Sequence, residues 1–329
     1  MSLYQQELTA AIQAVRKAAR VTAAVRRELV AGHSLEKNDR SPVTIADYGA
    51  QALIFHDLHA VHPDIPAVGE EDAGSLNDPD HAEMRQHLLR FVEQIDSGLS
   101  EDEVITAINR GNHSGGAEDR FWSLDPIDGT KGFLRDEQYA IALALIENGK
   151  PVLGVLGCPS LPVSAGSQST GCLFAAAEGV APFAELLSEP DTSQPVQTSA
   201  TASADQAVFC ESVESGHSSH SASADIIQAL GTTSEPLRMD SQCKYAAVAR
   251  GEADLYLRLP TRPGYEEKIW DHAAGAYLVG AAGGTVTDIE GRPLDFSLGR
   301  TLKNNCGIVA SNGKFHSAVL DAIQSTGNV

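Results

Sequence analysis

The six residues Asp125–Thr130, which read DPIDGT, set two carboxylates and a hydroxyl close together along the chain. They follow a strand-like run over residues 120–124. The proline fixes φ and has no N–H, while the glycine permits backbone geometries that are closed to other residues. We therefore predict that the strand ends in a rigid turn that aims Asp125, Asp128 and Thr130 at one point.

Neighbouring carboxylates cannot both stay ionised without compensation. At an effective dielectric near 20, two of them about 4 Å apart repel by roughly 4 kcal/mol. Either one carboxylate keeps its proton or a cation lies between them. The six residues alone leave both alternatives open.

Further acids stand beside strand-end or helix-start signals. Glu70 and Glu71 follow the apolar run 65–68, Asp47 begins a predicted helix, and Asp271 opens another. Singly, each has a simpler explanation, since an aspartate at a helix start is usually a cap and paired glutamates are usually exposed. Together with the DPIDGT stretch they form an all-oxygen set, which suits Mg²⁺ better than zinc or copper. Carboxylate-bound Mg²⁺ with open positions favours phosphoryl chemistry, with two metals acting on the attacking and leaving oxygens.

Hydrophobic periodicity predicts the elements that position these residues. We expect helices over residues 3–31 (closed by Gly32), Thr44–His62 (with Asp47 in its first turn), 80–95, 100–109, 221–230, 242–251 and Ala273–Ala282. We expect strands at Tyr139–Glu147, Pro151–Gly157, Cys172–Ala177, 207–211, 253–259 and Thr285–Asp288. Asn148-Gly149 predicts a hairpin, Ser100 with Glu103 a capping box, and residues 188–205 a surface loop.

Composition limits the class of protein. The 329 residues are enough for a large core in two closely packed subdomains. The net charge of −20 argues against nucleic acid and anionic membranes as partners, and it is compatible with cation binding. No apolar run predicts a membrane span, and no signal peptide is evident at the N-terminus. Five scattered cysteines without a C-x-x-C motif predict reduced thiols in an intracellular, cytoplasmic protein.

Three motifs, in order, resemble the signature of the lithium-sensitive, Mg²⁺-dependent phosphatases related to inositol monophosphatase. They are Glu70-Glu71, the DPIDGT stretch, and WDHAAG at residues 270–275. Within that superfamily the longer resemblance is to the 3'(2'),5'-bisphosphate nucleotidases. It is carried by residues 37–44, 121–135 (with Lys131-Gly132-Phe133), 216–220, 240–245, 256–260 and 267–275, and it is weakest at 73–118 and 160–205.

The resemblance implies a role for each matched residue. The metal ligands for two to three Mg²⁺ ions would be Glu70, Asp125, Asp128, Asp271 and the backbone carbonyl of Ile127. Asp47 and Thr130 would hold and deprotonate the attacking water. The nucleotide would contact Thr130, His217, Ser241, Lys244, Arg258 and Asp271. Lys244 and Arg258 make physical sense there, because so acidic a protein needs local cations to hold a second phosphate.

The resemblance also implies the fold, an α+β protein layered as an α/β/α/β/α sandwich. An antiparallel sheet would lie in the first half and a smaller mixed sheet in the second. Residues 1–160 would form the metal-binding subdomain, with a peripheral insertion at about 73–118. Residues 161–329 would carry the nucleotide pocket and Asp271.

The implied activity is hydrolysis of adenosine 3',5'-bisphosphate to AMP and phosphate. Its sulfated analogue, 3'-phosphoadenylyl sulfate, would give adenosine 5'-phosphosulfate. Inhibition by Li⁺ and Na⁺, with roles in sulfate assimilation and salt tolerance, would accompany this activity. We expect a monomer whose partner is this small-molecule substrate.

Two alternatives stay open. One is an inositol phosphate phosphatase acting on inositol monophosphate or inositol 1,4-bisphosphate, against which Lys131-Gly132-Phe133 and the second-half nucleotide segments argue. The other is a non-catalytic nucleotide sensor. A sensor could have lost Asp47, Thr130 or an acidic ligand, and none is lost.

Overall fold

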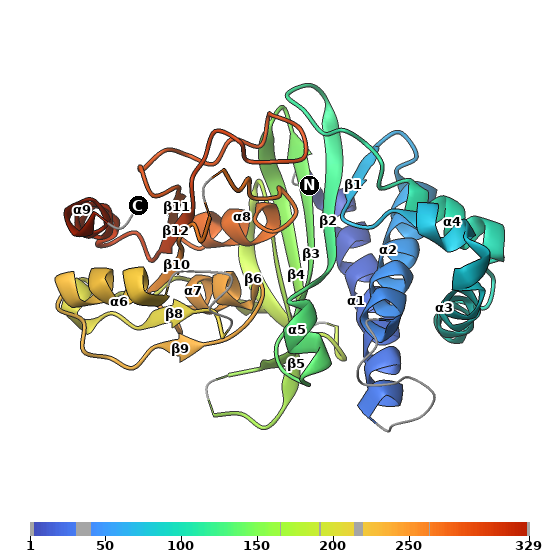
Figure 1. Cartoon of the computed structure of the whole chain (residues 1–329), viewed down its shortest axis with the longest axis horizontal. Coiled ribbons are helices and arrows are strands. Elements are labelled where there is room, and N and C mark those ends of the chain that lie inside the picture. The colour runs from blue at the N-terminus through green and yellow to red at the C-terminus, as the bar shows by residue number, and fades with distance from the viewer. Residues whose placement is uncertain are drawn as a thin grey trace.

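The computed structural model describes residues 3–30, 41–164, 166–190, 192–213, 220–262 and 264–327. The described helices and strands are arranged around two sheets (Figure 1). Up to the last strand of the first sheet, the elements are α1 (Gln5–Val30), α2 (Ser41–Val61), β1 (Ala67–Gly69), α3 (Ala82–Ile95), α4 (Glu101–Asn109), β2 (Arg120–Asp128), α5 (Thr130–Leu134), β3 (Ala140–Glu147), β4 (Lys150–Pro162), β5 (Thr170–Ala177), β6 (Val180–Leu186) and β7 (Gln194–Pro195). Those that follow are β8 (Phe209–Glu211), α6 (His220–Ala229), β9 (Leu237–Arg238), α7 (Cys243–Ala249), β10 (Leu255–Arg258), α8 (Ala273–Ala281), β11 (Thr285–Thr287), β12 (Ile308–Ser311) and α9 (His316–Thr326).

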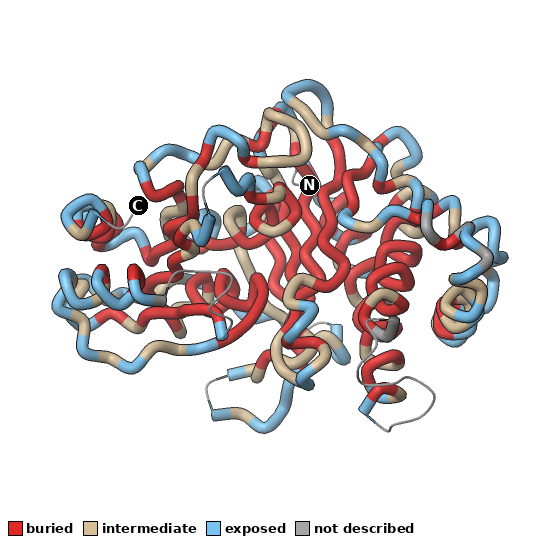
Figure 2. Tube along the Cα trace, in the orientation of Figure 1, coloured by how far each residue is buried: buried red, intermediate tan, exposed pale blue. Residues whose placement is uncertain are grey.

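The first sheet has the strand order β1-β2-β3-β4-β5-β6-β7. Strand β1 runs parallel to β2, and the other neighbours pair antiparallel. Alternate residues of a strand point to opposite faces of the sheet, and here both faces contribute to a buried core. In β3, Ile141 and Leu143 join the core beneath α1 and α2, whereas Ala140 and Ala142 join the core beneath α7 and α8. The central strands are accordingly buried along their length (Figure 2).

The second sheet is mixed and smaller, in the order β11-β12-β10-β8-β9. Strand β10 pairs antiparallel with β12 and parallel with β8. Helices α1 and α2 cover the outer face of the first sheet, α7 and α8 lie between the sheets, and α6 and α9 cover the far side (Figure 1). This confirms the predicted α/β/α/β/α sandwich.

Helix α1 shows why the sequence forms this layer. Ala11, Val15, Ala18, Val21 and Val25 recur at three- to four-residue steps and are all buried, so the helix presents one apolar stripe to the sheet. Helices α3 and α4 lie outside α2 at one end of the molecule (Figure 1).

Local turn and cap signals were reliable. Asn148 and Gly149 join β3 to β4 with φ values of 51° and 71°. A two-residue hairpin turn with positive φ at both positions matches the right-handed twist of the strands. The Ser100–Glu103 capping box is present at the start of α4. Both predictions are confirmed.

Some predicted boundaries were wrong. Helix α2 begins at Ser41, so Asp47 lies in its second turn and cannot cap it. The predicted loop 188–205 contains β7, which pairs with β6 at the sheet edge. The first sheet thus continues past residue 160, where we placed the change of subdomain. The predicted helix end at Gly32 lies outside the described residues.

The five cysteines are all free thiols, as predicted, and Cys158, Cys172, Cys210 and Cys243 are buried. Among the helices that the structure describes, none combines the length and the apolarity needed to cross a membrane.

The hairpin generates a stability prediction. At Gly149 an added Cβ would lie 2.6 Å from Cβ of Ser297, in addition to the strain of positive φ. We expect Gly149→Ala to lower the free energy of unfolding by about 1–3 kcal/mol in urea titrations. Gly280→Ala is the matched control, because Gly280 is a helical residue with no atom near the added Cβ. It should raise stability by up to about 1 kcal/mol, and equal losses in both variants would contradict the prediction.

Candidate active site

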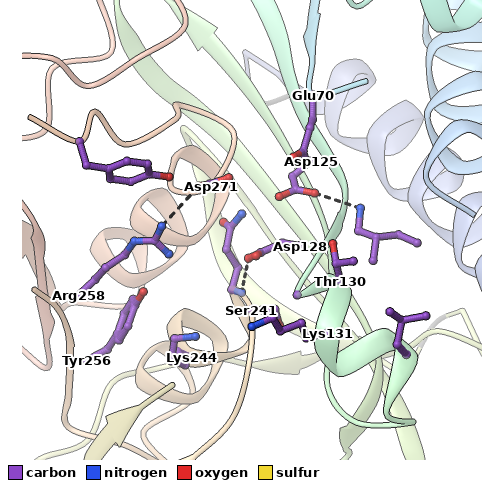
Figure 3. Close-up of a pocket in the computed structure, with 15 residues that line it drawn as sticks. Glu70, Asp125, Asp128, Thr130, Lys131, Ser241, Lys244, Tyr256, Arg258 and Asp271 are labelled. Carbon is purple, nitrogen blue, oxygen red and sulfur yellow. Dashed lines mark hydrogen bonds and ion pairs between the residues drawn. The ribbon is translucent and has the colours of Figure 1, made fainter. Parts of the chain in front are cut away.

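The DPIDGT stretch is a bulged strand end and not the turn that we predicted. Strand β2 continues to Asp128, and its register against β3 shifts between Asp125 and Asp128. Pro126 lies within this shift, where its missing N–H removes a ladder hydrogen bond. Gly129, with φ of 91°, then starts α5. The bulge still directs Asp125 and Asp128 into one cavity (Figure 3).

That cavity has a volume of about 420 Å³. Residues from both halves of the chain meet around it (Figure 3). Its described lining comprises Glu70, Asp125, Ile127, Asp128, Gly129, Thr130, Lys131, Leu134, Ser241, Gln242, Lys244, Tyr256, Arg258, Tyr265 and Asp271. The set includes every predicted metal position and, apart from Asp47 and His217, every other predicted site residue.

Four carboxylates from separate segments converge on the cavity: Glu70 after β1, Asp125 and Asp128 at the end of β2, and Asp271 before α8. Burial, followed by repulsion from Glu70 and Asp128, raises the pKa of Asp125 well above its usual range. Burial likewise raises the pKa of Asp271 well above that range, although the guanidinium of Arg258 opposes the shift. Burial raises the pKa of Glu70 as well.

Such a set needs positive charge. Ionised carboxylates this close are stable only with protons or cations between them. Their donors are all oxygens, and the Ile127 residue that supplies the predicted carbonyl ligand also lines the cavity. The residues therefore fit Mg²⁺.

Asp47 lies behind this set. It is buried in α2, and burial, then the charges of Glu71 and Glu70, raise its pKa well above the usual range. It is not part of the described cavity lining, whereas Thr130, in the first turn of α5, is. Their predicted partnership in activating water stays a prediction.

Lys244 and Arg258 lie across the cavity from Glu70 and Asp125, and Lys131 lies beside Thr130 (Figure 3). Lys244 is buried, its Nζ lies 3.4 Å from the carbonyl oxygen of Met239 and 5.2 Å from the centre of the Tyr256 ring, and burial lowers its pKa. One terminal nitrogen of Arg258 lies 3.8 Å from Oδ2 of Asp271. Ser241, at the edge of the cavity, has φ of 66°. His217 lies outside the described residues.

Gln242 is a site residue that sequence reasoning missed. Its backbone N–H donates to Oδ2 of Asp128 at 2.5 Å. Its side chain donates to the carbonyl of Trp270 at 2.9 Å and accepts from the N–H of Gly275 at 3.0 Å, so it ties Asp128 to the segment carrying Asp271. The sequence offered only a weak indication, a single glutamine next to Ser241 at the start of a predicted helix.

Gln51 was missed as well. From α2 it accepts from the N–H of Glu71 at 3.1 Å and donates to the carbonyl of Glu71 at 2.8 Å. It also donates to the carbonyl of Ile108 at 3.0 Å. A Cβ at Gly69 would lie 2.5 Å from the Gln51 side chain, so Gln51 can make these hydrogen bonds only if residue 69 is glycine. The two hydrogen bonds to Glu71 fix the backbone directly after Glu70.

Arg300 joins the two halves of the chain at the site. Its guanidinium donates to the carbonyls of Gly111 at 3.1 Å, His113 at 2.9 Å and Gly69 at 2.5 Å. It also lies over the ring of Trp270, 4.9 Å from the centroid. Arg300 thus links the residue before Glu70 to the residue before Asp271.

Known proteins are similar to this chain over nearly its whole length. The profile of the inositol monophosphatase family matches residues 4–327. A 3'(2'),5'-bisphosphate nucleotidase of Schizosaccharomyces pombe is 43% identical over 97% of this chain and 95% of its own, and one of Dictyostelium discoideum is 42% identical over 96% of each. Among solved structures, a Thermotoga maritima IMPase superposes with a TM-score of 0.65 at 21% identity, covering 98% of both chains. An inositol monophosphatase from Anabaena gives 0.64 at 19%, covering 98% of this chain and 97% of its own.

Removing the Arg300 link should destabilise the protein. Arg300→Leu removes three hydrogen bonds to backbone carbonyls, so we expect the free energy of unfolding to fall by about 2–4 kcal/mol. Arg238→Leu is the control, because Arg238 is largely exposed and pairs only with Glu211 among the described residues. It should lower stability by less than about 1 kcal/mol. Chemical denaturation of both variants measures the difference, and similar small effects would refute the role given to Arg300.

Proposed function

The chain belongs to the inositol monophosphatase family, and from this membership and its cavity we propose that it is a Mg²⁺-dependent 3'(2'),5'-bisphosphate nucleotidase. It would hydrolyse adenosine 3',5'-bisphosphate to AMP and phosphate. The observation that carries the proposal is the division of the cavity: Glu70, Asp125 and Asp128 line the side formed by the first sheet, and Lys244 and Arg258 line the other side, where Asp271 lies beside Arg258. A substrate with two phosphates can place one at the acids and the other at the cations. The names and the 42–43% identity of the two nucleotidase relatives support the same conclusion.

The carboxylates would perform the chemistry. Glu70, Asp125, Asp128, Asp271 and the carbonyl of Ile127 would hold Mg²⁺, which when bound neutralises charge on the phosphoryl oxygens and lowers the pKa of water. The Thr130 hydroxyl, in the first turn of α5, would orient the attacking water. A hydroxyl is too weak a base to act alone, so Asp47 would take the proton through it.

The cationic side chains would select the substrate. Lys244 and Arg258 are donors only, and they would hold the second phosphate by charge-assisted hydrogen bonds. Ser241 and His217 would add contacts to the nucleotide. The sulfated analogue carries the same 3'-phosphate, so it would give adenosine 5'-phosphosulfate.

Cellular properties follow from the same assignment. Li⁺ and Na⁺ would inhibit by competing for the carboxylates, and this sensitivity would link the enzyme to salt tolerance. Hydrolysis of the sulfated nucleotide would link it to sulfate assimilation. Free cysteines favour a reducing compartment. The exposed large apolar residues of the described chain, Leu3, Val30, Val61, Val213 and Tyr265, come from different segments, which favours a monomer.

Substrate preference distinguishes the proposal from an inositol phosphate phosphatase. We expect kcat/KM for adenosine 3',5'-bisphosphate to exceed that for inositol 1-phosphate at least about tenfold, because a site with buried donors discriminates against ligands that leave them unpaired. Released phosphate measured with both substrates in Mg²⁺ tests this. Faster turnover of inositol 1-phosphate would reject the assignment.

Asp128→Asn tests the metal assignment and the alternative of a non-catalytic sensor. Asparagine keeps an oxygen that can accept from the Gln242 N–H but removes a charge that would bind Mg²⁺. We expect kcat to fall at least about 100-fold with little change in thermal stability. Asp136→Asn is the control, since this aspartate is exposed and does not line the cavity. Near-normal turnover by Asp128→Asn would exclude Asp128 as a ligand, and an inactive wild-type chain would favour a sensor.

A further inference from the structure

A chain of buried hydrogen bonds lies behind Arg258. The hydroxyl of Tyr245 lies 2.8 Å from Nδ1 of His272, and Nε2 of His272 lies 3.2 Å from Oε2 of Glu267. The other oxygen of Glu267 accepts from Nε of Arg258 at 2.9 Å. Tyr245, His272 and Glu267 are respectively 1%, 1% and 5% exposed, so their polar atoms depend on one another.

The chemistry of these groups fixes the direction of the chain. Burial by itself would raise the pKa of Glu267, but the hydrogen bond from His272 and the guanidinium of Arg258 lower it to about 2. An ionised carboxylate only accepts, so Nε2 of His272 donates to Glu267. In a neutral ring Nδ1 is then the acceptor, and the Tyr245 hydroxyl donates to it. In this arrangement the Tyr245 hydroxyl, both ring nitrogens of His272 and both carboxylate oxygens of Glu267 have a hydrogen-bond partner.

This cluster could be mistaken for a metal site. One ligand atom each from Glu267, Asp271 and His272 lie within 4.8 Å of one another. Both oxygens of Glu267 and both ring nitrogens of His272, however, already have protein partners. The cluster therefore supports Arg258 rather than a cation of its own.

We propose that Glu267, held by His272 and Tyr245, is a positioning residue that sets the orientation of the Arg258 guanidinium. This inference rests on the proposed function, in which Arg258 holds the second phosphate. Anchoring Nε to Glu267 restrains the long side chain and leaves its terminal nitrogens directed at the cavity. One of them stays 3.8 Å from Asp271, which is too long for a hydrogen bond. Glu267 thus holds Arg258 so that its terminal nitrogens remain available for phosphate.

Steady-state kinetics with two substrates separate positioning from general structural damage. For Glu267→Gln we expect KM for adenosine 3',5'-bisphosphate to rise about tenfold while kcat changes less than about threefold. With p-nitrophenyl phosphate, which carries a single phosphate, neither constant should move appreciably. Glu266→Gln is the control, because this neighbouring glutamate is exposed and accepts only from Thr301 among the described residues. An unchanged KM for the bisphosphate, or equal losses of kcat on both substrates, would overturn the proposal.

A double-mutant cycle tests whether Glu267 acts through Arg258. In an Arg258→Gln background, Glu267→Gln should have no further effect on KM. The double variant removes both charges together, so it should fold even if a single variant is unstable. Independent, additive increases in KM would refute positioning. Failure of the wild-type enzyme to hydrolyse adenosine 3',5'-bisphosphate would instead refute the proposed function, so the two failures are distinguishable.

Discussion

Carboxylates that share one buried cavity repel each other, and the arrangement of Glu70, Asp125, Asp128 and Asp271 is governed by that repulsion. The fold opposes it largely with neutral donors and backbone geometry. Gln242 donates to Asp128, and the β2 bulge sets the separation of the two aspartates. Arg258 offsets the charge of Asp271 in part, and the other acids depend on these neutral contacts.

Each half of the chain supplies an incomplete site. The first sheet brings Glu70, Asp125 and Asp128 to its edge, and the segment before α8 adds Asp271. The α7–α8 layer packs against both sheets, so it sets the width of the cavity. The close fit is evident at Gly154, where a Cβ would lie 2.7 Å from the carbonyl oxygen of Ala274.

Sequence reasoning succeeded where the signal was local or carried by a motif. The Asn148-Gly149 turn, the Ser100 cap and the positions of the acidic residues could all be predicted in this way. It failed where the outcome depends on distant partners. The DPIDGT stretch remains in the sheet because β3 pairs with it, and the β12–α9 segment has no strong pattern of its own. The roles of Gln51 and Arg300 could not be predicted, because both side chains bind backbone carbonyls, and every residue has a carbonyl.

The bond from Arg300 to Gly69 spans 231 residues of sequence. Closing so long a loop is entropically demanding, and such contacts form late in folding. A chain emerging from the ribosome completes its first sheet long before Arg300 has been synthesised. During that interval Glu70, directly after β1, lacks the tie that Arg300 makes to Gly69. The carboxylate set is therefore complete only near the end of synthesis, because Asp271 and Arg300 both belong to the last part of the chain.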